Sequence, residues 1–148
     1  MSHDAYGMER STVERSSAID RRRAGVLAVD DHASFLAVLR DVVGGTRRLK
    51  VIGQAQSGEG ALQAVEELGP DVVLMDVRMP GLGGIEAARR IKAGRPSTLI
   101  VLISSTHPDE LPREAAEGIA DAVIWKNDLQ PWVLDEIWLR RGGHAAAG

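Results

Sequence analysis

Side chains able to hold a metal ion and a phosphate stand at the ends of four short aliphatic runs. Asp30 and Asp31 follow the first of these runs, Asp76 follows the second, and Ser104 and Lys126 follow the third and fourth. Three carboxylates that come close together repel one another unless a cation relieves the repulsion. Mg²⁺ suits this task, because it takes only a few carboxylates and keeps waters that a phosphate can replace.

The chemistry expected of such a group is phosphoryl transfer. A carboxylate can attack a phosphoryl group and form an aspartyl phosphate, a role that fits Asp76, which would also ligate the ion. Lys126 would balance the phosphoryl oxygens as a point charge, and Ser104 would donate a hydrogen bond to them. Alone, each of these residues would be read as a helix cap or loop residue. The pattern by itself does not choose between Ser104 and Ser105.

These side chains need elements that bring them together, and the sequence from Gly25 onward alternates strand-like with helix-like segments, as βαβ units do. Several strand-like runs are apolar on both faces, which is typical of strands covered by helices on both sides. The predicted strands are Val26–Val29, Val51–Ala55, Val72–Met75, Leu99–Ile103 and Ala122–Trp125. Helical stripes run through residues 35–43, 61–68, 85–91, 115–119 and 132–138, and Pro131 opens the last.

This alternation predicts an α/β fold, a doubly wound parallel sheet of five strands with helices on both faces. Right-handed crossovers leave few strand orders, among them the flavodoxin-like order 2-1-3-4-5. Ligands of such sheets bind outside the carboxyl ends of the strands, so the polar side chains would meet at one rim. We expect one domain over residues 25–141, with flexible tails over residues 1–24 and 142–148.

Composition narrows the function further. The chain has 148 residues, 44% apolar residues and no cysteine, which excludes disulfides, thiolate metal sites and a cysteine nucleophile. No apolar stretch approaches the roughly 20 residues that a bilayer span needs. The net charge of −3 gives no broad basic surface, so direct contact with nucleic acid is not expected. The first 23 residues lack the apolar centre of a secretory signal, which favours a cytoplasmic location.

Three motifs resemble the receiver domain of two-component response regulators over about residues 25–140. The most specific is residues 71–91, DVVLMDVRMPGLGGIEAARRI, which is similar to the family's phosphoacceptor strand, its Met-Pro-Gly loop and the following helix. Residues 29–32, Val-Asp-Asp-His, resemble the acidic pair after the first strand. Residues 102–105, Leu-Ile-Ser-Ser, resemble the hydroxyl motif after the fourth strand. The spacing from Asp76 to Ser104 and Lys126 suits receivers that precede helix-turn-helix output domains.

The resemblance implies a CheY-like fold and a role for each site residue. Asp76 would be the phosphorylated residue and Asp31 a direct Mg²⁺ ligand, with Asp30 holding the ion through water and the backbone carbonyl of Arg78 completing the protein ligands. Ser104 would be the switch hydroxyl, Lys126 the phosphate-pairing lysine and Ser105 the small residue that leaves the phosphate room. The side chains of Arg78 and Thr106 would tune how fast water reaches the acyl phosphate.

The resemblance also implies partners. A histidine kinase or phosphotransfer protein would supply the phosphoryl group, an unidentified output protein would read it, and a homodimer is left open. The protein would not be a dedicated enzyme, although it would dephosphorylate itself. Since no output segment follows residue 141, we expect either a stand-alone receiver signalling through protein–protein contacts or a separated piece of a longer regulator.

Departures from the family pattern keep other functions in view. Val123 stands where receivers usually have Tyr or Phe, and Trp125 lies next to the lysine, where we interpret it as a surface filler. An interaction module with the receiver fold that signals without phosphorylation is therefore the main alternative. A Mg²⁺-dependent phosphatase would need a general acid where Arg78 stands. His32 is interpreted as a polar helix-start residue, and the spread of the histidines predicts no zinc site.

Overall fold

A five-stranded parallel sheet forms the centre of the protein, in the order β2-β1-β3-β4-β5. This computed structural model describes residues 22–111 and 118–147. The strands are β1 (Ala24–Val29), β2 (Leu49–Ala55), β3 (Val72–Asp76), β4 (Leu99–Ser104) and β5 (Ala122–Trp125). The predicted fold class and strand order are confirmed, and each predicted strand lies within an observed one.

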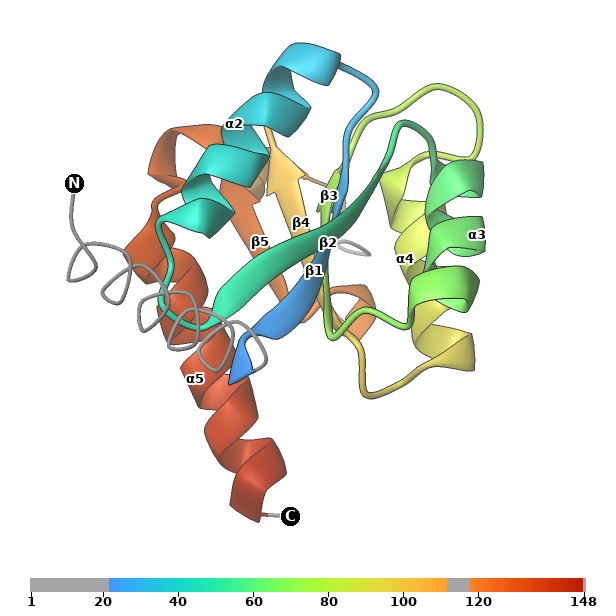
Figure 1. Ribbon diagram of the computed structural model, residues 1–148. Helices are drawn as coiled ribbons and strands as arrows, with labels where there is room; N and C mark the ends of the chain where they lie inside the picture. Colours follow the sequence, from blue (N-terminus) through green and yellow to red (C-terminus); the bar gives the residue numbers. More distant parts are fainter. Residues whose placement is uncertain (1–21, 112–117, 148) are drawn as a thin grey trace, which may run out of the picture.

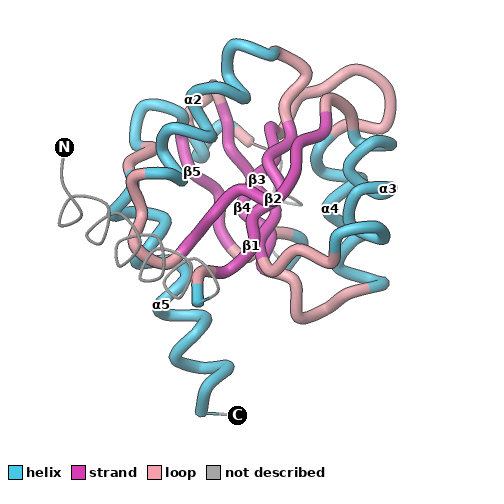
Figure 2. Tube along the Cα trace, in the orientation of Figure 1, coloured by secondary structure: helices cyan, strands magenta, loops and turns pink. Residues whose placement is uncertain are grey.

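Helices cover both faces of the sheet (Figures 1 and 2). They are α2 (Ala33–Gly44), α3 (Gly58–Leu68), α4 (Gly84–Gly94) and α5 (Pro131–Ala147), with short 3₁₀ turns η1 (Pro108–Glu110) and η3 (Lys126–Asp128). In Figure 1, α2 and α5 lie on one side of the strands and α3 and α4 on the other. No helix among the described residues is long and apolar enough to cross a bilayer.

The side chains of the central strands alternate between two hydrophobic cores. In β3, Val72 and Leu74 belong to the core that includes residues of α2 and α5, whereas Val73 and Met75 belong to the core that includes residues of α3 and α4. None of these four residues is more than 1% exposed. Because both faces of the strand are buried, the run has to be apolar throughout, which is why the sequence shows no polar alternation here.

Two boundaries differ from the sequence prediction. β1 begins at Ala24, inside the predicted tail 1–24, because the Ala24 N–H donates to the Arg48 carbonyl at 2.7 Å. The backbone of α5 continues to Ala147, through most of the predicted tail 142–148, where alanine, the strongest helix former, follows the two glycines. Residues 1–21 of the first tail lie outside the described residues, as do residues 112–117, which hold Ala115 and Ala116 of the predicted fourth helix.

A charged cluster fixes the other end of the sheet, away from the rim. The Asp121 carboxylate, just before β5, accepts the Ile100 N–H at 2.7 Å and pairs with Lys92 at 2.6 Å. Arg141 of α5 pairs with the same carboxylate at 2.9 Å. The cluster ties α4, β4 and α5 together at the amino ends of the strands, so it supports the sheet without entering the site.

Candidate functional site

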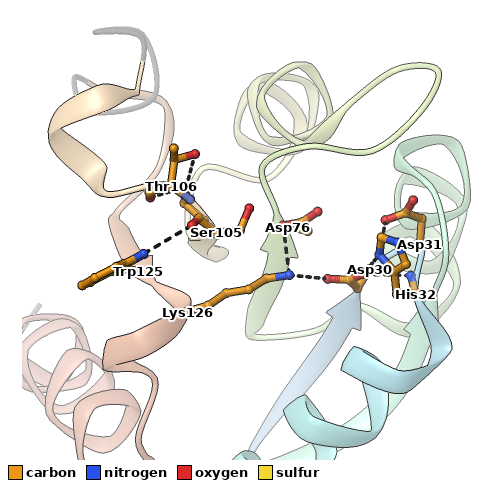
Figure 3. A network of polar contacts seen from close by, with 9 residues as sticks. Asp30, Asp31, His32, Asp76, Ser105, Thr106, Trp125 and Lys126 are labelled. Carbon is orange, nitrogen blue, oxygen red and sulfur yellow. Dashed lines mark hydrogen bonds and ion pairs between the residues drawn. The ribbon is translucent and has the colours of Figure 1, made fainter.

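The acidic pair lies where β1 ends and α2 begins. The Asp30 side chain is fully buried, and its Oδ1 accepts the backbone N–H of His32, the N-cap residue of α2, at 2.8 Å. Asp31 is more accessible, with 24% of its side chain exposed. The His32 ring lies beside both carboxylates, with Nδ1 at 3.3 Å from Asp30 Oδ1 and 3.2 Å from Asp31 Oδ1 (Figure 3).

Asp76 is the last residue of β3, on the strand adjacent to β1. It is only 6% exposed, and the chain continues from it into a loop anchored by the Val77 N–H, which donates to the Ile103 carbonyl at 2.9 Å. Burial raises the pKa of the Asp76 carboxyl from its ordinary value of 3.8 to about 6, and repulsion from Asp30 and Asp31 adds to the rise, while Lys126 opposes it. The site therefore holds a carboxylate whose charge is disfavoured by its surroundings.

The first turn of α4 packs closely against the backbone of Asp76. A Cβ at Gly84, the first residue of α4, would lie 2.0 Å from the Asp76 carbonyl oxygen. Only glycine fits such an approach, so the second glycine of the Gly83-Gly84 pair packs α4 against the end of β3. The path of the loop that carries Arg78 is thereby constrained.

Lys126 reaches from the end of β5 between two of the carboxylates. Its Nζ lies 3.7 Å from Asp30 Oδ2 and 3.8 Å from Asp76 Oδ1. Figure 3 shows the lysine side chain reaching toward both carboxylates. Both distances exceed the 2.7–2.9 Å or so of a charge-assisted hydrogen bond. The same Nζ lies 3.9 Å from the centroid of the Phe35 ring. The ammonium thus balances two negative charges without being hydrogen-bonded to either.

Ser104 ends β4 on the same rim and is 2% exposed. Its hydroxyl donates to the Thr106 carbonyl at 2.6 Å and accepts the Thr106 N–H at 3.0 Å. A third, longer contact joins it to the Thr106 hydroxyl at 3.4 Å, so the hydroxyl has to leave these Thr106 oxygens before it can donate to another acceptor.

Trp125 lies directly across from this turn, since it pairs in register with Ser104. Its indole N–H donates to the Ser105 carbonyl at 3.4 Å, and its ring meets that of His107 edge to face, with centroids 5.4 Å apart. Trp125 is thus more than a surface filler, because it contacts the loop after β4 (Figure 3). Val123, where the family usually has an aromatic residue, packs partly buried against the core under α3 and α4.

The acidic group has the properties of a cation site. Asp30, Asp31 and His32 each offer a ligand atom, and these atoms lie within 4.8 Å of one another. Two buried carboxylate oxygens, Asp30 Oδ2 and Asp31 Oδ1, have no hydrogen-bond partner. Burying carboxylate oxygens without a hydrogen bond costs free energy unless a positive charge compensates them. The donor set therefore fits a hard divalent ion such as Mg²⁺.

The predicted site residues are therefore brought to one rim, with Asp30, Asp76 and Lys126 in direct charge contact and Asp31 beside them. Arg78 lies exposed in the loop after β3. Sequence reasoning missed Phe35, which it assigned only to the apolar stripe of α2. The contact joins segments far apart in the chain, and no sequence signal points to it.

Comparisons with known proteins show the family to which this sequence and fold are similar. Residues 26–134 match the family model for the response regulator receiver domain. Response regulator GacA of Pseudomonas viridiflava is 42% identical over 105 residues, covering 68% of this chain and 47% of that protein. Response regulator UvrY of Escherichia coli is 35% identical over 112 residues, covering 76% of this chain and 51% of that protein. The chain thus spans about half the length of the curated relatives it matches.

Solved structures show the same fold. The response regulator domain of Thermotoga maritima CheB is 32% identical and superposes with a TM-score of 0.72, over 82% of this chain and 98% of that one. The signal receiver domain of the NarL response regulator from Mycobacterium tuberculosis is 27% identical, with a TM-score of 0.67 over 78% of this chain and 97% of that one.

Proposed function

The chain belongs to the family of response regulator receiver domains of two-component systems, and we propose that it takes up a phosphoryl group on Asp76 and passes the signal on through protein–protein contacts. One observation carries the proposal: a buried carboxylate with a pKa near 6 lies 3.8 Å from a lysine that it does not hydrogen-bond. Such an oxygen keeps its lone pairs available for attack, and the lysine is ready to balance new charge.

The phosphoryl donor is a phosphohistidine of a histidine kinase or of a phosphotransfer protein. An Asp76 carboxylate oxygen attacks the phosphorus, a P–O bond forms, the P–N bond breaks, and the leaving imidazole nitrogen takes up a proton. Lys126 and Asp30 flank the acceptor. In the product, Lys126 pairs with a phosphoryl oxygen, which places opposite charges together in a poorly solvated site.

The acidic group supports Mg²⁺ as the cofactor. Asp31, Asp76 and the backbone carbonyl of Arg78 would hold the ion, with Asp30 acting through water. When bound, Mg²⁺ neutralises the clustered carboxylates and the phosphoryl oxygens. Asp30 Oδ2 and Asp31 Oδ1, buried oxygens that accept no hydrogen bond, support this assignment.

Ser104 links phosphorylation to the protein surface. Its hydroxyl leaves Thr106 and donates to a phosphoryl oxygen, which changes the turn over residues 104–107 that Trp125 contacts. The receiver does not act on a separate substrate, and hydrolysis of its own acyl phosphate resets it, at a rate tuned by the side chains of Arg78 and Thr106. We place this cycle in the cytoplasm, with an output protein that binds the rearranged surface.

The test is phosphorylation of the purified chain. Incubation with Mg²⁺ and a small phosphodonor such as acetyl phosphate should add one phosphoryl group, measured by intact mass. Asp76→Asn should take up none, whereas Asp128→Asn, an exposed carboxylate on η3, should behave as the unaltered protein. If the folded protein takes up no phosphoryl group, the receiver fold serves as a phosphorylation-independent interaction module, which the aliphatic Val123 would favour.

A further inference from the structure

The face of the Phe35 ring contacts the Lys126 ammonium. Phe35 lies in the first turn of α2 and packs partly buried against the core under α2 and α5. Lys126 Nζ lies 3.9 Å from its ring centroid, well within the roughly 6 Å reach of a cation–π contact. The ammonium therefore faces two carboxylates and one aromatic face.

Lys126 Nζ lies at nearly the same distance from the two carboxylate oxygens and from the ring centroid. The Asp30 and Asp76 oxygens lie 3.7 and 3.8 Å from Nζ, each too far for a hydrogen bond. The partial negative charge on the face of the ring attracts the ammonium from another side, and the ring also keeps water from that side. The ring thus helps to keep the Lys126 ammonium beyond hydrogen-bond distance of the two carboxylates.

We propose that Phe35 is a positioning residue, which holds the Lys126 ammonium between Asp30 and Asp76 without a hydrogen bond to either. This inference rests on the proposed function. A lysine hydrogen-bonded to Asp76 would withdraw electron density from the attacking oxygen and would have to break that bond before pairing with a phosphoryl oxygen. Held by the ring, Lys126 leaves Asp76 free to attack and can shift to the incoming phosphoryl group.

The composition of the chain makes the contact directly observable. Phe35 is the only phenylalanine, and the lysines are Lys50, Lys92 and Lys126. In protein labelled with ¹³C-lysine, the ε protons of Lys126 should be shifted upfield by the ring current and should show a cross-relaxation signal to the Phe35 ring. Lys92, paired with Asp121, serves as the internal reference. If the Lys126 signals show neither feature in the unaltered protein, the proposal is wrong.

Variants of Phe35 test the consequence for phosphorylation. Phe35→Leu keeps an apolar side chain in the core but removes the π face, and Phe35→Tyr keeps that face. Phosphorylation by acetyl phosphate and Mg²⁺ should be about two- to fivefold slower in the Leu variant, the rate equivalent of an ordinary cation–π contact. The Tyr variant, which keeps the ring face, should restore the rate.

The outcomes separate this inference from the proposed function. Thermal unfolding would establish that both variants are folded. If the unaltered protein is phosphorylated and the Leu variant reacts at the same rate, Phe35 does not position Lys126, while the receiver function stands. If the unaltered protein is not phosphorylated at all, both proposals are wrong.

Discussion

Replacing Asp76 with Asn should stabilise the unphosphorylated protein, and the gain should depend on pH. The Asp76 carboxyl has a pKa raised from 3.8 to about 6, chiefly by burial, with Asp30 and Asp31 adding repulsion. A raised pKa means that the folded state binds the proton more tightly than the unfolded state. Stability therefore falls as the pH rises from about 4 to about 6, and the full penalty remains at higher pH.

The size of the penalty follows from the pKa change. Since each pKa unit corresponds to about 1.4 kcal/mol, the rise from 3.8 to about 6 gives about 3 kcal/mol at pH 7. At pH 5 the folded-state carboxyl is mostly protonated, and the same relation gives roughly half of that penalty. Asn has nearly the shape of the protonated acid and carries no charge, so Asp76→Asn should recover most of this free energy.

Urea unfolding between pH 5 and pH 8, without divalent ions and followed by tryptophan fluorescence, measures the effect. The difference in unfolding free energy between Asp76→Asn and the unaltered protein should be about 1 kcal/mol larger at pH 7 than at pH 5 and then level off. Groups that titrate in both proteins cancel in this difference. Asp128→Asn is the matched control and should show no gain. A difference that does not change with pH, or an Asp76→Asn variant less stable than the unaltered protein at pH 7, would refute the reasoning.

The charge of Asp76 should also govern phosphorylation, because only the charged carboxylate attacks. At low Mg²⁺, the rate of phosphorylation by a small phosphodonor should rise as the pH passes through about 6. A flat profile between pH 5 and pH 7, corrected for titration of the donor, would contradict this. Lys126→Met removes the charge that lowers the Asp76 pKa, so the midpoint of that profile should move to higher pH, and a midpoint that stays in place would argue against the contact. Gly84→Ala places a Cβ 2.0 Å from the Asp76 carbonyl oxygen and should cost about 1–3 kcal/mol in urea unfolding, whereas Gly94→Ala on the same helix has open space and should cost nothing. Equal stability of these two alanine variants would show that the loop yields freely.

The fold could be predicted because its strongest determinants are local. Val72–Met75 is apolar on both faces, and such a short run between helical stripes fits only a covered strand. Once the order of strands is restricted by right-handed crossovers, Asp30, Asp76 and Lys126 must fall on one rim. Their proximity in the structure follows from these rules.

What could not be predicted depends on contacts between distant segments and on the path of loops. Phe35 reads as one apolar residue in a helical stripe, and nothing in that stripe indicates a lysine that lies far along the chain at the end of β5. The direction of the Ser104 hydroxyl is set by the turn at Thr106, since a hydroxyl can rotate to any nearby partner. The backbone of α5 continues to Ala147, into the predicted tail 142–148.

The hydrogen-bonded turn at Ser104 affects how much output the unphosphorylated protein gives. Its hydroxyl satisfies both a carbonyl and an N–H of Thr106, at 2.6 and 3.0 Å. Breaking two hydrogen bonds costs about 2 kcal/mol at about 1 kcal/mol each, which makes an unprompted rearrangement roughly thirtyfold rarer than it would be with an unbonded hydroxyl. On the proposed mechanism, this turn suppresses background output, and its strength sets how large a stimulus must be before the downstream protein responds.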